Sequence, residues 1–134
     1  MKDTLQAGLS TTRRFTVDRA STIDFMGDDL RVYATPSLVR DLEITCRDFL
    51  LEHLDAGEDS VGTRVEIDHL APTLLDMWVD LTVEITAVKG PMVTFTVSGR
   101  DAAGDAIVKG THMRFASPVA KTAERLRAKA GKLA

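Results

Sequence analysis

The chain has 134 residues and a mass of 14.6 kDa, a size that predicts one domain with a single hydrophobic core. Its composition, 44% hydrophobic and 28% charged, excludes a disordered chain and a disulfide scaffold. The net charge of -3 divides into -7 for residues 1–117 and +4 for residues 118–134. The acidic body is a poor nucleic-acid surface, while the basic end is either a solvated helix face or a contact for phosphate groups.

No stretch approaches the roughly 20 apolar residues of a membrane helix, and the N-terminus lacks the apolar segment of a signal peptide. The single cysteine, Cys46, has no partner for an internal disulfide, which favours a reducing compartment. We therefore expect a cytoplasmic protein without membrane contact, in which Cys46 is a small core residue rather than a nucleophile.

The first predicted element is a short strand over residues 13–17, followed by a loop over residues 18–34. A long helix is predicted to begin at Thr35 and Pro36, because threonine is a common N-cap residue and proline is favoured at the first helical position. Its apolar residues recur on one side of a helical wheel, and the helix ends near residue 54. Asp41 falls on the opposite side of that wheel, where we expect it to be solvated.

Four strands are predicted after the helix, over residues 61–69, 77–87, 93–98 and 106–115, and a weaker helix over residues 118–132. Alternation in the first of these strands places Val61, Val65 and His69 on one face and Gly62 on the other. This order indicates an α+β fold in which the long helix covers one face of an antiparallel sheet. One helix leaves a sheet edge exposed, so we expect a dimer that continues the sheet.

Two polar residues fall where apolar ones are expected. Glu43 lies inside the apolar stripe of the long helix, near its border, and His69 ends a strand on its apolar face. Because burial of an unpaired charge is costly, Glu43 is either an ion-paired residue at the edge of the stripe or a chemically active group. The two residues can meet within one chain or across a dimer, and a carboxylate beside an imidazole is a common arrangement for base catalysis.

Other polar residues have two interpretations each. Thr35 places a hydroxyl at the helix N-terminus, where free N–H groups can stabilise an oxyanion, although capping the helix is an adequate role. His112 lines a pocket or packs against the sheet, and alternation does not decide which. His53 is expected to be structural, and the three histidines lack metal-ligand spacing, so no metal site is predicted.

The order and spacing of several short motifs resemble the hot-dog-fold acyl-CoA thioesterases, and specifically the fluoroacetyl-CoA thioesterase family. The matching residues, spread over roughly residues 7–117, are Ala34-Thr35-Pro36, Glu43, Val61-Gly62-Thr63, His69 and Gly110-Thr111-His112. The resemblance implies an antiparallel sheet wrapped around a long central helix, as one domain over residues 1–134. It also implies a homodimer, or a dimer of dimers, with active sites at the subunit interface.

In that family a threonine, a glutamate and a histidine act together on a short acyl thioester, and the matching residues here are Thr35, Glu43 and His69. The resemblance implies that Glu43 is the nucleophile or the general base toward water, that His69 transfers the proton, and that Thr35 positions the carboxylate or the water. Gly62 and His112 are the implied substrate-binding residues. Coenzyme A is then part of the substrate, so no cofactor is expected.

Two departures from the family pattern concern specificity. The stretch over residues 18–33 is shorter than the phenylalanine-rich lid of the fluoroacetyl-specific member and offers Phe25, Met26 and Tyr33, so discrimination for fluoroacetate is not expected. Met113 stands where many relatives have a glutamate after the final Gly-Thr-His. The prediction is therefore a thioesterase for a short or medium acyl-CoA. The alternatives are a module that binds an acyl-CoA or another apolar ligand without turnover, and a hydratase or dehydratase on the same fold.

Overall fold

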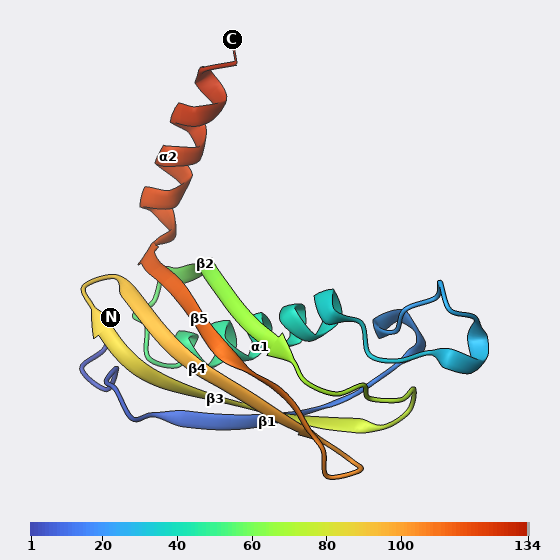
Figure 1. The fold of residues 1–134 in the computed structure, drawn as a ribbon. Coiled ribbons are helices and arrows are strands. Elements are labelled where there is room, and N and C mark those ends of the chain that lie inside the picture. Colours follow the sequence, from blue (N-terminus) through green and yellow to red (C-terminus); the bar gives the residue numbers. More distant parts are fainter. Residues whose placement is uncertain (134) are drawn as a thin grey trace.

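The computed structural model describes residues 1–133 as a five-stranded antiparallel sheet curved around one long helix (Figure 1). The helix, α1, spans Thr35–Leu51. The strands are β1 (Ser10–Thr16), β2 (Glu58–His69), β3 (Trp78–Lys89), β4 (Met92–Asp101) and β5 (Ala106–Pro118). Their order across the sheet is β1-β3-β4-β5-β2, with every pair antiparallel. The predicted α+β architecture is confirmed, and β2 forms one of the two sheet edges.

The core lies between α1 and the inner face of the sheet. Because residues four apart share one side of a helix, α1 buries Leu38, Leu42, Cys46 and Leu50 together. These side chains join a cluster with alternate residues of β3, among them Leu81. Burial raises the pKa of the Cys46 thiol to about 12, so this thiol stays protonated and Cys46 is a core residue, as predicted.

Both ends of α1 differ from the prediction. The N-cap residue is Ala34, whose side chain makes no capping hydrogen bond, and Thr35 is the first helical residue. The alternative role of Thr35 as a helix cap is therefore wrong, because its hydroxyl bonds a residue on another element. The helix ends at Leu51 rather than near residue 54, since the next residues form tighter turns, including a bond from Leu54 N–H to the Leu51 carbonyl.

Asp41 is buried, and the prediction that it is solvated is wrong. Residues 18–34, which precede α1, contain two short 3-10 turns, Arg19–Ser21 and Asp28–Leu30. Tyr33 at the end of this segment is also buried and donates its hydroxyl hydrogen to the Asp41 carboxylate over 2.5 Å. The helical-wheel prediction assumed that only the sheet covers α1, whereas Tyr33 also packs against the helix at Asp41.

The alternation predicted for β2 fails at one bulge. The register between β2 and β5 shifts between Gly62 and Arg64, so one extra residue enters β2 there. A one-residue shift exchanges the two faces of a strand. Gly62 consequently faces α1, whereas Val61 lies on the outer face and is 53% exposed. The assignment of both residues to faces is thus wrong.

The second helix, α2, spans Val119–Gly131 and projects away from the body (Figure 1). It follows β5 directly, and its first N–H group donates to the Gly57 carbonyl over 2.8 Å. None of its residues is buried. Within residues 1–133, no helix combines the length and the apolar character needed to cross a membrane.

Candidate active site

Thr35 and His69 form a hydrogen-bonded pair where the start of α1 meets the end of β2. The Oγ1 atom of Thr35 lies 2.8 Å from Nδ1 of His69. Threonine reaches His69 because it is the first residue of the helix rather than its cap, and the inner face of β2 ends on the histidine. The other ring nitrogen of His69, Nε2, is buried and has no hydrogen-bond partner among the described residues, 1–133. A buried polar atom without a partner is rare and often marks a functional group.

The pair lies in an apolar hollow of about 390 Å³. The hollow is lined by residues of the 18–34 segment and of the loop after β2: Ile23, Phe25, Val32, Tyr33, Leu70, Ala71 and Pro72. Burial in these surroundings disfavours the charged imidazolium and lowers the pKa of His69. A neutral imidazole can accept a proton, as a base or shuttle must.

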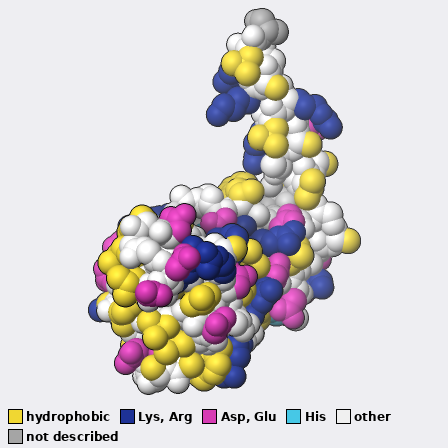
Figure 2. All heavy atoms as spheres, turned by 90° about the vertical axis from the view of Figure 1, so that its right-hand side faces the viewer, with side chains coloured by type: hydrophobic (Ala, Val, Ile, Leu, Met, Phe, Trp, Pro, Cys, Tyr) yellow, Lys and Arg dark blue, Asp and Glu magenta, His cyan; other side chains and the backbone are white. Residues whose placement is uncertain are grey.

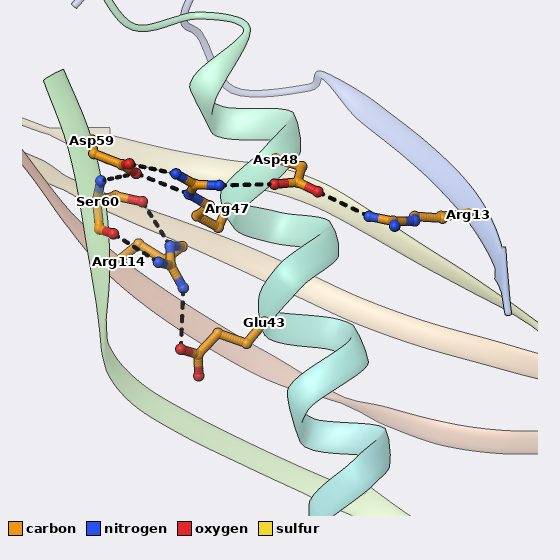
Figure 3. A network of polar contacts seen from close by, with 7 residues as sticks. All are labelled: Arg13, Glu43, Arg47, Asp48, Asp59, Ser60 and Arg114. Carbon is orange, nitrogen blue, oxygen red and sulfur yellow. Dashed lines mark hydrogen bonds and ion pairs between the residues drawn. The ribbon is translucent and has the colours of Figure 1, made fainter. Parts of the chain in front are cut away.

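Glu43 lies elsewhere, next to Arg114 of β5 (Figure 3). Its Oε1 atom is 3.6 Å from Nη1 of Arg114, and its side chain is 46% exposed. Arg114 is buried and donates to Oγ of Ser60 over 2.7 Å and to the Ser60 carbonyl over 2.9 Å. Arg114 is therefore fixed in place by β2, and its guanidinium faces an open carboxylate at the border of the helix stripe.

His112 completes this second group of residues. Its Nδ1 atom donates to the Arg64 carbonyl over 2.8 Å, which leaves Nε2 to accept from Nη1 of Arg114 at 3.2 Å. Burial, with a smaller contribution from the Arg114 charge, lowers the pKa of His112. The neutral ring has both nitrogens occupied, so it holds Arg114 in position and has no free nitrogen for proton transfer.

Gly62 lies directly against Glu43 and His112. A Cβ atom at this position would be 3.1 Å from Cε1 of His112 and 3.3 Å from Cδ of Glu43. Both distances are tighter than ordinary van der Waals contact, so a side chain here would displace the carboxylate or the ring. The bulge in β2 is what points this glycine inward.

The structure places the predicted residues in two groups rather than one. Within residues 1–133, no hydrogen bond or ion pair joins Glu43 to Thr35 or His69. Glu43 lies eight positions after Thr35 in α1, an axial distance of about 12 Å. Glu43 opens into its own hollow of about 270 Å³, whose lining includes Ile44 and Arg114 but neither Thr35 nor His69.

Sequence reasoning missed Arg114. Its position two residues after His112 in a strand places both on the same face, and a charge on the buried face of a strand is the signal that could have identified it. A larger hollow, of about 620 Å³, opens on the outer face of the sheet near Trp78 and Asp80 and includes none of the predicted site residues. His53 is structural, as expected, since Nδ1 of its ring lies 2.9 Å from Oγ1 of Thr4.

Comparisons with known proteins agree with this architecture. The family model for fluoroacetyl-CoA-specific thioesterases matches residues 17–120. The fluoroacetyl-CoA thioesterase of Streptantibioticus cattleyicolor is 29% identical over 136 residues, covering 96% of this chain and 97% of that protein.

Solved structures give the same result. A thioesterase superfamily member from Thermus thermophilus superimposes with a TM-score of 0.88 at 26% identity, covering 98% of this chain and 97% of the other. A single-residue mutant of the fluoroacetyl-CoA-specific thioesterase superimposes with a TM-score of 0.86 at 29% identity, covering 96% and 99% of the two chains. A hot-dog-like protein from Thermanaerovibrio acidaminovorans shares the fold at 22% identity and a TM-score of 0.83. With its hot-dog fold and a match over most of its length, the chain belongs to the fluoroacetyl-CoA-specific thioesterase family.

Proposed function

We propose that this thioesterase hydrolyses short or medium acyl-CoA thioesters to the free acid and coenzyme A, at sites formed by Thr35 and His69 of one copy and Glu43 of a second. The observation that carries the proposal is the hydrogen bond between Thr35 and His69, which leaves Nε2 of His69 buried and unpartnered beside an apolar hollow. A water molecule or a substrate atom in the hollow would bond this Nε2 atom.

The free edge of β2 supports a dimer. β2 has twelve residues, pairs only with β5, and exposes Val61 (53%) and Val65 (44%). A long edge strand with apolar side chains is a template for pairing with another chain, and a twofold axis pairs two such strands antiparallel. Two copies joined in this way form one continuous sheet.

Such a dimer would also bring the two groups of residues together. Glu43 lies against Gly62, whereas Thr35 bonds His69, seven residues further along β2 and roughly 20 Å away. Antiparallel pairing of the two full strands places Gly62 of one copy opposite Val65 of the other, four residues from His69 rather than seven. Glu43 of one copy then approaches the Thr35–His69 pair of its partner.

The chemistry follows from the three groups. Glu43 acts as nucleophile on the thioester carbonyl carbon or as general base that takes a proton from the attacking water. Thr35, at the start of an α1 N-terminus that no side chain caps, positions the carbonyl oxygen near the first N–H groups, where the developing negative charge is stabilised. The carbon–sulfur bond then breaks, and His69 takes up the proton removed from water and passes it to the leaving thiolate. If Glu43 is the nucleophile, water afterwards hydrolyses the acyl anhydride formed on Glu43 and supplies that proton. Gly62 leaves room for the substrate beside the carboxylate, and His112 holds Arg114 in position.

Coenzyme A enters this scheme only as part of the substrate, with no further cofactor. A cytoplasmic location fits the one cysteine of the chain, Cys46, which is a free thiol. For the acyl group, the hollow beside His69 is open and only moderately large, and it offers one phenylalanine, Phe25, which is 78% exposed. We therefore expect short and medium acyl chains to be accepted without preference for fluoroacetate.

The test is release of free thiol from a panel of thioesters: acetyl-, fluoroacetyl-, butyryl-, octanoyl-, phenylacetyl- and palmitoyl-CoA. The proposal predicts the highest kcat/KM among acetyl to octanoyl and comparable values for acetyl- and fluoroacetyl-CoA. Saturable binding of acyl-CoA without thiol release would instead identify a binding module. Turnover confined to palmitoyl-CoA, or strong selectivity for fluoroacetyl-CoA, would contradict the proposed substrate class.

A further inference from the structure

α2 carries an apolar stripe that the rest of residues 1–133 leaves largely exposed. Val119, Ala123, Leu126 and Ala130 are spaced by four, three and four residues, which places them on one side of the helix. Val119 is 52% exposed and Leu126 is 63% exposed. Figure 2 shows α2 projecting from the body, with hydrophobic side chains between lysines and arginines. This spacing is typical of a helix that packs against a partner surface.

The stripe begins at the free edge of β2. Val119 and Val61 of β2 line one hollow together with Phe115, and α2 continues from the end of β5 and projects away from the sheet (Figure 1). The stripe is therefore continuous with the edge where the proposed function joins a second copy. A helix of thirteen residues is about 20 Å long, which spans about four neighbouring strands.

The surface that α2 meets in such a dimer is the lid segment of the partner, which we define as residues 18–34. α2 starts beside Glu58, at the beginning of β2. In an antiparallel pair this end lies beside the partner's opposite end of β2, where the lid segment and Leu70 surround the hollow of the Thr35–His69 pair. Phe25 (78%), Leu70 (48%) and Leu74 (51%) are all exposed there.

The charges of the two surfaces are complementary. Residues 119–133 carry five basic side chains and one acidic one, whereas the lid segment carries four aspartates and two arginines. Pairing of α2 with the α2 of the second copy is excluded on two grounds. Both helices are basic, and antiparallel strands of twelve residues would place their starts roughly 40 Å apart.

We propose that α2 of each copy packs its apolar stripe across the lid segment of the partner and forms the outer wall of the partner's acyl hollow. This inference depends on the dimer of the proposed function. It assigns a role to the basic end of the chain: α2 closes the hollow over the acyl group and excludes water from it. Leu126, in the middle of the stripe, contributes to this wall.

Two variants test the inference in the full-length chain. Leu126→Glu places a charge in the stripe, whereas Ala128→Glu places the same charge on the opposite side of α2, where Ala128 is also exposed. Neither residue is buried, so both variants should fold. Amide hydrogen exchange of residues 22–33 reports on cover of the lid segment, and light scattering reports on the oligomeric state. We expect Leu126→Glu to accelerate exchange in residues 22–33 at least tenfold and to lower kcat/KM for octanoyl-CoA more than for acetyl-CoA, while Ala128→Glu leaves both unchanged.

Other outcomes overturn the inference and separate it from the proposed function. Equal exchange of residues 22–33 in both variants, with a dimer retained, would overturn the role of α2 alone. A monomeric wild-type protein that still releases thiol would overturn this inference and the shared site together. Protection of α2 amides by phosphatidylserine vesicles, with residues 22–33 unaffected by Leu126→Glu, would identify a membrane-surface helix instead.

Discussion

The two halves of the candidate site differ in how completely their polar atoms are satisfied. Around Arg114, the hydrogen bonds run from Ser60 through the guanidinium to His112 and on to the Arg64 carbonyl. Beside the lid segment, His69 has one hydrogen bond, to Thr35, and one buried nitrogen without a partner. The Arg114 half is a closed hydrogen-bond network that holds side chains in place. The His69 half has one ring nitrogen that can still bond a substrate or water.

Glu43 and His69 of one chain do not form a complete active site together. Glu43 lies at the rim of the satisfied network and is half-exposed, because Arg114 approaches from one side only. His69 is enclosed by apolar residues, and its buried Nε2 atom has no hydrogen-bond partner within residues 1–133. The Glu43 carboxylate and the His69 imidazole are thus held in separate parts of one chain. In the proposed dimer, Glu43 of one copy meets His69 of the other.

Glu43→Gln gives the largest expected effect. The amide keeps the size of the carboxylate but cannot act as nucleophile or base, so we expect kcat to fall about 10³-fold, within the range of positioned acid–base catalysis. The melting temperature should change little, since the side chain is 46% exposed. Glu52→Gln, on the exposed end of α1, is the matched control. If Glu43 is only an ion-pair partner of Arg114, activity survives in Glu43→Gln.

Substitutions in the Thr35–His69 pair should have the next largest effect on kcat. His69→Ala removes the proton shuttle, and we expect kcat to fall about 10²-fold. Thr35→Val should lose less, about tenfold, because it removes the hydroxyl that bonds His69 and positions the substrate carbonyl but keeps the N–H groups of α1, while Thr35→Ser keeps the hydroxyl and most of the activity. Steady-state kinetics on acetyl-CoA separate the three variants. Equal activity of Thr35→Val and Thr35→Ser would show that the hydrogen bond has no role.

Arg114→Met tests the hydrogen-bond network around Arg114 through its effect on the free energy of unfolding. The variant leaves Nε2 of His112 and both Ser60 acceptors without their donor, and breaking a buried charged network costs about 3 kcal/mol of unfolding free energy. Urea denaturation measures the loss. Arg127→Met, on the exposed surface of α2, should change stability by less than about 0.5 kcal/mol. Equal stability of the two variants would contradict the positioning role of Arg114.

The smallest effect concerns pH. Burial lowers the pKa of both His69 and His112, so the unfolded chain binds protons more readily than the folded one. Their contribution to stability is therefore complete above the unfolded pKa of about 6.5 and is lost as pH falls below it. Urea denaturation at a series of pH values should show this decline, and His112→Asn should make it shallower. Stability that rises on acidification would contradict the burial of neutral histidines.

Much of the fold was predictable from periodicity and turns. The long helix, the four later strands and the terminal helix follow local patterns, and the resemblance to hot-dog thioesterases is confirmed by the family match over residues 17–120. Three details failed because they depend on contacts between elements, which the periodicity of a single element does not contain. The lid segment buries Asp41, the bulge turns Gly62 inward, and the Thr35 hydroxyl bonds His69 rather than its own helix.

The residues of the candidate site were identified in part. Glu43 and His69 stood out because a polar residue interrupts an apolar face, a local signal. Arg114 carried a weaker signal, its place on the same strand face as His112, which becomes informative only once the register with β2 shows that this face is buried. The separation of Glu43 from His69 along β2 depends on how α1 crosses the sheet, which periodicity does not contain.

The shared site is tested most directly by mixing two inactive variants. Glu43→Gln and His69→Ala chains are co-refolded in equal amounts, and thiol release is compared with each variant alone. If Glu43 acts on the partner's Thr35–His69 pair, each mixed dimer contains one site with both residues intact, and random mixing restores about a quarter of wild-type activity. If each chain uses its own Glu43 and His69, no mixed dimer contains an intact site, and the mixture stays as inactive as its components.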